Sequence, residues 1–250
     1  PSWFLVFLYF TLSARDQFET LLDGQASIWN GWVIGACTSS LLFLSVLLHE
    51  LAHSFVAIGE GLKVRDITLF FLGGMASLEK ECPTSKGSLK IAISGPVVSL
   101  LLAFLMILLS NNLSVSNFIL SNLFKQVGSL NLLIGVFNLL PIIPLDGGVI
   151  LKSLIWYFTG SKRAGIKVAI GSARLISFLA IFIGILSLLR GNLYIAICFS
   201  IIGLFVFSSS KSQSQIIQIQ KILSELYVNQ VCSRSFRVLE DDLPVKVLSK

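Results

Sequence analysis

Long apolar runs, separated by short polar stretches, dominate the pattern along this 250-residue chain. A helix needs about 20 mostly apolar residues to cross the hydrocarbon core of a bilayer. The pattern therefore predicts an α-helical membrane protein with about six transmembrane helices. The predicted spans are residues 1–13 (cut short), 31–59, 88–110, 127–151, 172–189 and 192–208. The last two are close together, which favours a helical hairpin.

The stretch between the second and third spans, residues 61–81, has a different pattern. Ile67 to Leu72 is rich in strand-forming residues and is followed by Gly73 and Gly74, which predicts a short strand or hairpin at the membrane or dipping into it. Non-helical backbone at that depth must be buried in protein or line a water-filled cavity. The two glycines allow another backbone to approach closely, or else they form a tight turn.

Composition and charge agree with a membrane protein. Charged residues make up 13% of the chain and apolar residues 54%, whereas a soluble domain usually carries about 25% charged residues. The net charge of +6 does not indicate nucleic-acid binding, because the basic residues lie between the apolar runs. Of 19 Lys and Arg, all but Arg15, Lys125 and Arg190 fall in alternate loops or after residue 210. This distribution predicts an integral multi-pass protein with both termini in the cytoplasm.

The chain becomes more polar from about residue 211. Apolar residues recur with helical periodicity over 213–226, which predicts an amphipathic helix, and residues 234–248 have the mixed composition of a soluble segment. We therefore expect a transmembrane domain at residues 1–210 and a cytosolic tail at 211–250. The first residues show no signal-peptide pattern, so we also expect the numbering to begin inside a longer protein.

The only two histidines of the chain lie in the second span, in the run His49-Glu50-Leu51-Ala52-His53. Residues four apart share one face of a helix, so both imidazoles can reach one metal ion, and Glu50 can take a proton from a water activated by that ion. Ionisable groups inside a span are costly and usually functional. The alternative is a histidine pair that hydrogen-bonds neighbouring helices, which leaves Glu50 without a role.

A catalytic zinc ion needs a third protein ligand and an open coordination position. With no third histidine, a cysteine or a carboxylate must supply the ligand. The four cysteines are widely spaced and form no CxxC pair, and among the 13 acidic residues only Glu50 and Asp146 fall inside predicted spans. From the helical rise, His53 and Asp146 lie roughly 9–13 Å below the cytoplasmic surface. The sequence thus predicts one Zn²⁺ per chain at His49, His53 and Asp146, nearer the cytoplasmic face.

Four motifs follow one another over about residues 1–205: HELAH at 49–53, FLGG at 71–74, SGP at 94–96, and NLLPIIPLDGG at 138–148. Together they resemble the site-2 protease family of intramembrane zinc metalloproteases. The resemblance implies zinc ligation by His49, His53 and Asp146, with Glu50 as the general base. It further implies cleavage of the transmembrane segment of another protein, such as a membrane-anchored regulator, in regulated intramembrane proteolysis.

Lesser roles follow from the same resemblance. Asn138 and Pro141 would help to position substrate, although Asn138 could instead hydrogen-bond a neighbouring helix. The strand before Gly73 and Gly74 could pair with an unwound substrate, or could be a plain re-entrant packing element. Pro141 and the nearby Pro144 should break or kink the fourth span just before its acidic ligand. Gly95 with the following proline is assigned to helix packing without a catalytic role.

The tail carries a weaker likeness. Residues 231–238 resemble the opening of a nucleotide-sensing CBS domain, so we expect a truncated CBS domain and a nucleotide as a possible ligand of its missing part. No PDZ-like insertion separates the spans.

Two other function classes compete with the protease. A metal transporter would need polar ligands at several depths, and a zinc-stabilised scaffold would need a fourth protein ligand. The sequence shows one cluster at one depth and no persuasive fourth ligand, which favours the protease.

Overall fold

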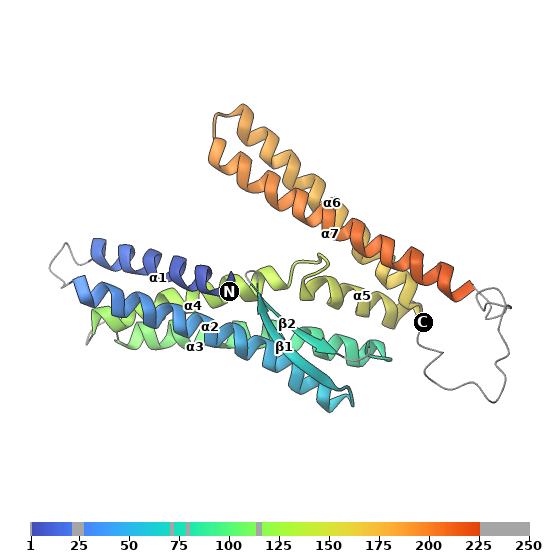
Figure 1. Ribbon diagram of the computed structural model, residues 1–250, viewed down its shortest axis with the longest axis horizontal. Coiled ribbons are helices and arrows are strands. Elements are labelled where there is room, and N and C mark those ends of the chain that lie inside the picture. Colours follow the sequence, from blue (N-terminus) through green and yellow to red (C-terminus); the bar gives the residue numbers. More distant parts are fainter. Residues whose placement is uncertain (1, 22–27, 71–72, 79–80, 114–116, 226–250) are drawn as a thin grey trace, which may run out of the picture. The chain divides into compact units, whose positions relative to one another are not determined.

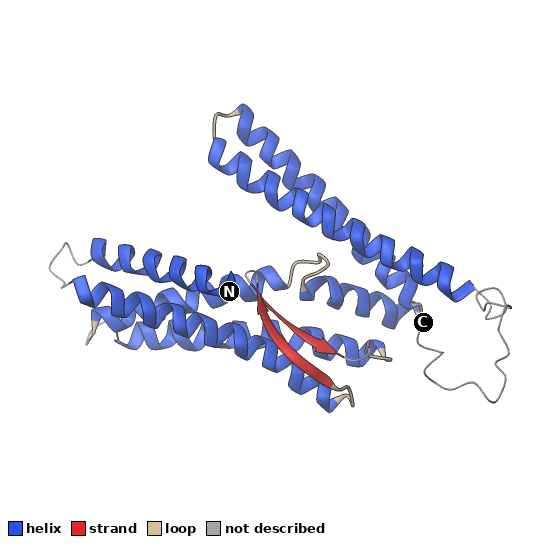
Figure 2. Ribbon diagram, in the orientation of Figure 1, coloured by secondary structure: helices blue, strands red, loops and turns tan. Residues whose placement is uncertain are grey.

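The computed structural model describes residues 2–21, 28–70, 73–78, 81–113 and 117–225 (Figure 1). Helices make up most of this described part, with one antiparallel pair of strands (Figure 2). The elements are α1 (Ser2–Leu21), α2 (Ile28–Gly59), β1 (Val64–Phe70), β2 (Gly73–Leu78), α3 (Ser85–Leu113), α4 (Phe118–Asn138), α5 (Asp146–Thr159), α6 (Lys162–Leu189) and α7 (Leu193–Glu225). The chain divides into two compact units, residues 1–210 and 211–250. What each unit does stays a prediction.

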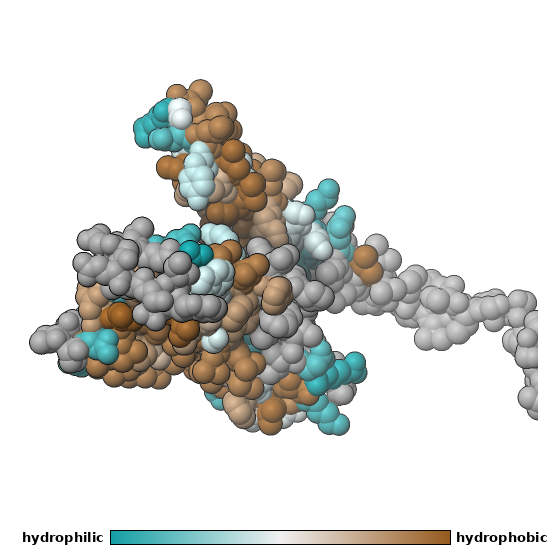
Figure 3. Space-filling view, turned by 60° about the vertical axis from the view of Figure 1, so that its left-hand side comes forward, coloured by the Kyte–Doolittle hydropathy of each residue, from teal (hydrophilic) through white to brown (hydrophobic). Residues whose placement is uncertain are grey.

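Within the described residues, five helical segments are long and apolar enough to cross a membrane: 31–59, 85–113, 118–138, 162–189 and 193–215. Apolar side chains cover most of the visible helical surface, and hydrophilic atoms gather near helix ends (Figure 3). The predicted helical, multi-pass membrane fold is therefore confirmed. The predicted first span forms the start of α1, which also carries the charged residues Arg15 and Asp16.

The predicted break in the fourth span is confirmed, although its first helix begins earlier than predicted, at Phe118. Residues 127–151 are not one helix, because α4 ends at Asn138 and α5 begins at Asp146. Pro141 and Pro144 explain the interruption, since proline lacks an N–H and disfavours helix in the residue before it. The fifth span begins earlier than predicted, at Lys162, and the predicted amphipathic helix at 213–226 continues α7 as far as Glu225.

Helices α1 to α4 pack side by side, with α2 and α4 running in the same direction and α3 opposite to them (Figure 1). Phe18, Ile34, Leu123 and Val127 form a buried cluster that joins α1, α2 and α4. On the other side of α4, the hydroxyls of Ser110 and Ser121 each donate to the backbone oxygen of the other residue, over 2.8 and 2.9 Å. Such interhelical hydrogen bonds stabilise helix pairs in an apolar medium.

Helices α6 and α7 form the predicted hairpin (Figure 1). Glycine allows the two backbones to approach closely, because a Cβ at Gly203 would lie 2.6 Å from the Ile181 side chain and 3.1 Å from the Ser177 oxygen. The Ser177 hydroxyl also donates to the Gly203 oxygen over 2.7 Å. The small residues thus serve as the interhelical contact expected inside a bilayer.

The β element between α2 and α3 is an antiparallel hairpin, as predicted. Phe70 pairs with Gly73 and Leu69 with Gly74, so both glycines begin β2. Residues 71–72 lie outside the described part. An irregularity at Arg65 shifts the register by one residue, as in a β-bulge. The hairpin packs against α2, the helix that carries both histidines.

Charged contacts gather where several helices end or begin. Lys90 of α3 pairs with Glu60, just after α2, over 2.7 Å. Lys162 at the start of α6 pairs with Glu81, in the segment before α3. The hydrogen bond from Lys162 holds the pKa of the Glu81 carboxyl below its ordinary value. Each of these exposed pairs contributes little to the free energy of unfolding. Their positions show that these helix ends are polar.

Candidate metal centre

Both histidines project from the same face of α2, one helical turn apart. Their ring centroids are 4.9 Å apart, and their Nε2 atoms are 3.2 Å apart. His49 is buried at 3% exposure. This is the geometry that the four-residue spacing predicts for two ligands of one ion.

The carboxylate of Asp146 completes the cluster from α5, 97 residues further along the chain than His49. Its Oδ2 lies 3.1 Å from His49 Nε2, and its Oδ1 lies 3.3 Å from His53 Nε2. One donor atom from each of the three residues lies within 4.8 Å of the other two. The structure therefore brings together the three side chains that the sequence proposed as ligands, while their role as ligands stays a prediction.

The interruption between α4 and α5 places Asp146 in the first turn of a new helix. Two glycines follow it, and both are required by the close approach of the preceding segment. A Cβ on Gly147 would lie 2.2 Å from the Leu140 oxygen, and one on Gly148 would lie 2.6 Å from Ile143 N. The glycine pair thus lets the chain fold back on the first turn of α5 and fixes where the carboxylate points.

Substituting Gly147→Ala should therefore disturb the centre as well as the fold. The methyl group would meet backbone atoms that cannot rotate away, and overpacking of this kind typically destabilises by about 1–3 kcal/mol. We expect a lower melting temperature and weaker zinc binding. Gly171→Ala is the matched control, because nothing lies within 4 Å of a Cβ there. Equal melting temperatures and zinc affinities for the two variants would contradict this account.

The hydrogen bonds of His53 show which of its nitrogens can bind a metal. His53 Nδ1 lies 2.6 Å from the Ile91 carbonyl oxygen. A carbonyl only accepts hydrogen bonds, so Nδ1 carries the proton, and the neutral ring presents an Nε2 lone pair to the cluster. If His49 adopts the same tautomer, its Nε2 lone pair, that of His53 and the Asp146 carboxylate would all be free to bind one shared cation.

The donor set and its spacing fit zinc. Imidazole nitrogens and a carboxylate oxygen are ordinary zinc ligands, and two histidines with one carboxylate make a known catalytic set. Ligands about 2.0–2.1 Å from a tetrahedral ion lie roughly 3.3 Å from one another. The two Nε2 atoms are 3.2 Å apart, which matches this spacing. The carboxylate of Asp146 places a different oxygen near each ring, Oδ2 at 3.1 Å from His49 Nε2 and Oδ1 at 3.3 Å from His53 Nε2. The side chain of Asp146 is the more accessible part of the cluster, at 22% exposure against 4% for His49.

Glu50 lies next to His49 on α2 and is buried at 8% exposure. Its backbone oxygen accepts a hydrogen bond from the Ser54 hydroxyl over 3.0 Å. A carboxylate buried inside a membrane-spanning helix is costly and usually functional. The position suits proton transfer, and that role stays a prediction.

The residues predicted to position substrate are placed differently from one another. Asn138, the last residue of α4, lies beside the cluster with its Nδ2 3.4 Å from His49 Nε2. Pro141 lies in the connection to α5, where its carbonyl accepts from the Ser172 hydroxyl of α6 over 2.6 Å. Gly73 and Gly74 lie in β2. Of these four, the structure gives a contact with the ligands only for Asn138 among the described side chains.

Sequence reasoning missed the contacts that α3 makes with the histidines, among them the Ser94 hydroxyl 3.3 Å from His53 Nδ1. Ser99 Oγ lies 2.9 Å from His49 Nδ1, the Ile91 oxygen accepts from His53, and the Cα of Gly95 faces both Nε2 atoms. The SGP motif contains Gly95, and Ser99 follows it by one helical turn. That spacing was the available signal, but the motif was assigned to helix packing.

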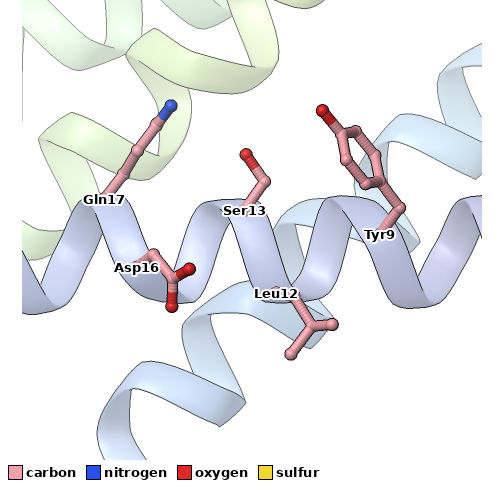
Figure 4. Close-up of a pocket in the computed structure, with 5 residues that line it drawn as sticks. All are labelled: Tyr9, Leu12, Ser13, Asp16 and Gln17. Atoms are coloured by element: carbon pink, nitrogen blue, oxygen red, sulfur yellow. The ribbon is translucent and has the colours of Figure 1, made fainter.

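A separate hollow opens on α1 (Figure 4), with a wall formed by Tyr9, Leu12, Ser13, Asp16 and Gln17. The oxygen of Gln17 accepts from the Gln126 amide of α4 over 2.8 Å. Helix α1 packs against the first part of α2, where the Thr11 hydroxyl donates a hydrogen bond to the Ser39 hydroxyl. His49 lies ten residues further along α2, which corresponds to about 15 Å. The hollow is therefore distinct from the histidine cluster.

Comparisons with known proteins agree with this site. The family model for peptidase family M50 matches residues 37–119 and 111–183, which include all three proposed ligands. A Synechocystis sp. protein named as a zinc metalloprotease, sll0528, is 38% identical over 88% of this chain and 58% of its own length. Zinc metalloprotease MJ0392 of Methanocaldococcus jannaschii is 30% identical over 88% of this chain and 62% of its own length.

The fold comparison gives the same result. The solved structure of the site-2 protease from Methanocaldococcus jannaschii matches with a TM-score of 0.54 and 32% identity, covering 85% of this chain and 88% of that one. The present chain spans less than two thirds of the length of the curated relatives it matches. The matches in sequence and in fold cover the membrane helices that hold the cluster, and on this ground the chain belongs to peptidase family M50, the family of site-2 protease and related zinc metalloproteases.

Proposed function

We propose that this chain is an intramembrane zinc metalloendopeptidase that cleaves the transmembrane segment of another membrane protein. One observation carries the proposal: the Nε2 atoms of His49 and His53 and the carboxylate of Asp146 converge within 4.8 Å. His49 and His53 lie in α2, which is long and apolar enough to span a bilayer, and Asp146 meets them from the first turn of α5. Membership of a zinc metalloprotease family supports hydrolysis as the chemistry.

The roles of the residues follow from their positions. His49, His53 and Asp146 would hold the zinc ion, which would supply Lewis acidity for polarising the scissile carbonyl and acidifying water. Glu50 accepts a proton from the attacking water and passes it to the leaving amine as the peptide bond breaks. Asn138, with its amide beside His49, is placed to orient the substrate carbonyl. Burial of the cluster excludes bulk water and strengthens each of these interactions.

A helical substrate hides its peptide bonds and must unwind before attack, and its freed amides then need partners. The hairpin of β1 and β2 offers them, because an extended peptide can add to the free edge of a sheet. Gly73 and Gly74 at the start of β2 permit close approach of that peptide. Substrates with helix-breaking residues near the cleaved bond should accordingly be the better ones. A membrane-anchored regulator is a suitable class of substrate.

The charged contacts support an orientation. Glu60 follows the end of α2 and pairs with Lys90, and Glu81, shortly before α3, pairs with Lys162 at the start of α6. In our proposal these polar helix ends face the cytoplasm, as the distribution of basic residues predicts. Both termini then lie in the cytoplasm, with the active centre nearer that face. A nucleotide-binding CBS domain beyond residue 250 remains part of the proposal, and residues 226–250 lie outside the described part.

Removal of the metal tests the proposed function directly. We expect a zinc chelator such as 1,10-phenanthroline to stop cleavage of a helical substrate in detergent or proteoliposomes. Stoichiometric zinc should restore the activity, because the ligands are preformed and the chain stays folded. Zinc content and cleavage are measured on the same samples. Full cleavage by protein shown to be free of metal would contradict the proposal.

The same samples separate the protease from the competing functions. A metal transporter would move zinc across a liposome membrane and leave the peptide intact. A zinc-stabilised scaffold would bind the ion with four protein ligands and do neither. The structure gives three ligand residues in the cluster among the described side chains, which favours a centre with an open position.

A further inference from the structure

One face of α3 contacts both histidines. Ile91, Gly95 and Ser99 are spaced four residues apart, so they lie above one another on the same side of the helix. The Ile91 oxygen lies 2.6 Å from His53 Nδ1, and the Ser99 hydroxyl lies 2.9 Å from His49 Nδ1. The same helix therefore contacts both rings at Nδ1, and both Nε2 atoms face the ligand cluster.

Ser99 is the side chain that sets the tautomer and the ring orientation of His49. It is buried at 1% exposure, so its hydroxyl meets little competition from water. When His49 binds a cation through Nε2, its Nδ1 must carry the proton. The Nδ1–H group then donates a hydrogen bond to the Ser99 oxygen. Partners of this kind fix the tautomer and the orientation of a metal-binding imidazole.

Gly95 provides the space in which the two rings meet. A Cβ at this position would lie 2.2 Å from His53 Nε2 and 2.6 Å from His49 Nε2. These are the donor atoms themselves, so any side chain at residue 95 would displace them. Helix α3 can thus approach close enough to hydrogen-bond both rings only because residue 95 is glycine.

We propose that this face of α3 positions the metal ligands, with Ser99 as the residue that orients His49 and Gly95 as the residue that leaves room for both donor nitrogens. The proposal rests on zinc binding by His49, His53 and Asp146. It gives the SGP motif and the serine after it a function at the centre in addition to helix packing. Ser99 acts through His49 and does not touch the reacting atoms.

Ser99→Ala tests the proposal at nearly constant volume. Loss of such a partner typically weakens metal binding about 10- to 100-fold, which we would measure by chelator competition on the purified full chain. In the cobalt-substituted protein the visible absorption bands should shift, because His49 is free to turn. The control is Ser177→Ala, which removes an equally buried hydroxyl that bonds the Gly203 oxygen over 2.7 Å. That control should keep wild-type affinity and spectrum.

Two further variants make the test specific. Ser99→Thr keeps the hydroxyl and should restore most of the affinity lost in Ser99→Ala. Gly95→Ala should lose stoichiometric zinc, whereas Gly171→Ala should not, since nothing lies within 4 Å of a Cβ at Gly171. Melting temperatures of the metal-free proteins show whether each variant is folded. If Ser99→Ala does not fold, Ser99→Cys replaces it, because a thiol is nearly the same size and a weak acceptor.

The outcomes separate this proposal from the proposed function. A wild-type protein that binds no zinc would overturn the metal centre itself. Wild-type zinc binding, with an unchanged affinity and cobalt spectrum in the folded Ser99 variant, would overturn the role of α3 alone. Weaker binding in Ser99→Ala but not in Ser177→Ala supports the role of α3.

Discussion

Glu50→Gln is expected to lower the rate of peptide cleavage by about 100- to 10,000-fold, the range that general acid–base catalysis usually contributes. Glutamine has nearly the shape of glutamate but cannot accept a proton at neutral pH. Because Glu50 is buried beside the ligands and is not one of the three converging donors, zinc should stay bound at about one ion per chain. Single-turnover cleavage of a helical substrate, together with metal analysis, measures both effects.

The matched control is Glu60→Gln, which changes the same group ten residues further along. Glu60 pairs with the largely exposed Lys90, and exposed pairs of this type contribute at most about 1 kcal/mol. Its cleavage rate should stay close to that of the wild type. A Glu50→Gln protein that cleaves at the normal rate would remove Glu50 from the mechanism.

Asp146→Ala should lose both zinc and cleavage, the second large effect. The substitution removes the ligand contributed by α5 and leaves two imidazoles, whereas catalytic zinc sites usually have three protein ligands. We expect clearly less than one ion per chain after dialysis, and no activity without a large excess of zinc. Metal analysis and cleavage of the same preparation measure the outcome.

Asp66→Ala is the control for this variant, because Asp66 is exposed on β1 and lies outside the ligand cluster. Asp146→Asn adds a second comparison, since it keeps an oxygen near both histidines but removes the negative charge. Its zinc affinity should fall between those of the wild type and the alanine variant. Stoichiometric, tightly held zinc in Asp146→Ala would show that a different residue is the third ligand.

The helical part of the site could be predicted because it depends on local pattern. The apolar run around His49 and His53 specifies a membrane helix, and the four-residue spacing then places both rings on one face. Asp146 could be proposed because few carboxylates occur in apolar segments, and the structure places it within 3.3 Å of both rings. Family resemblance pointed to the same three residues.

The parts that hydropathy does not register depend on tertiary packing or on backbone effects. Residues 139–145 are mostly apolar, so the hydropathy pattern continues through the break between α4 and α5. Only the two prolines predicted a break or kink there, and the structure shows the break, with two separate helices. The contact of Ser99 with His49 joins residues 50 positions apart, and a single serine in an apolar helix carries no signal of its own.

The break before Asp146 also affects how the chain resists unfolding. The ligands come from two separate helices, so a bound ion would cross-link α2 to the start of α5 and close a loop of 97 residues. By mass action, a ligand present at 100 times its dissociation constant stabilises the folded state by about 2.7 kcal/mol. The ion required for hydrolysis would therefore also stabilise the contact between α2 and α5. Separation of these two helices would release the ion.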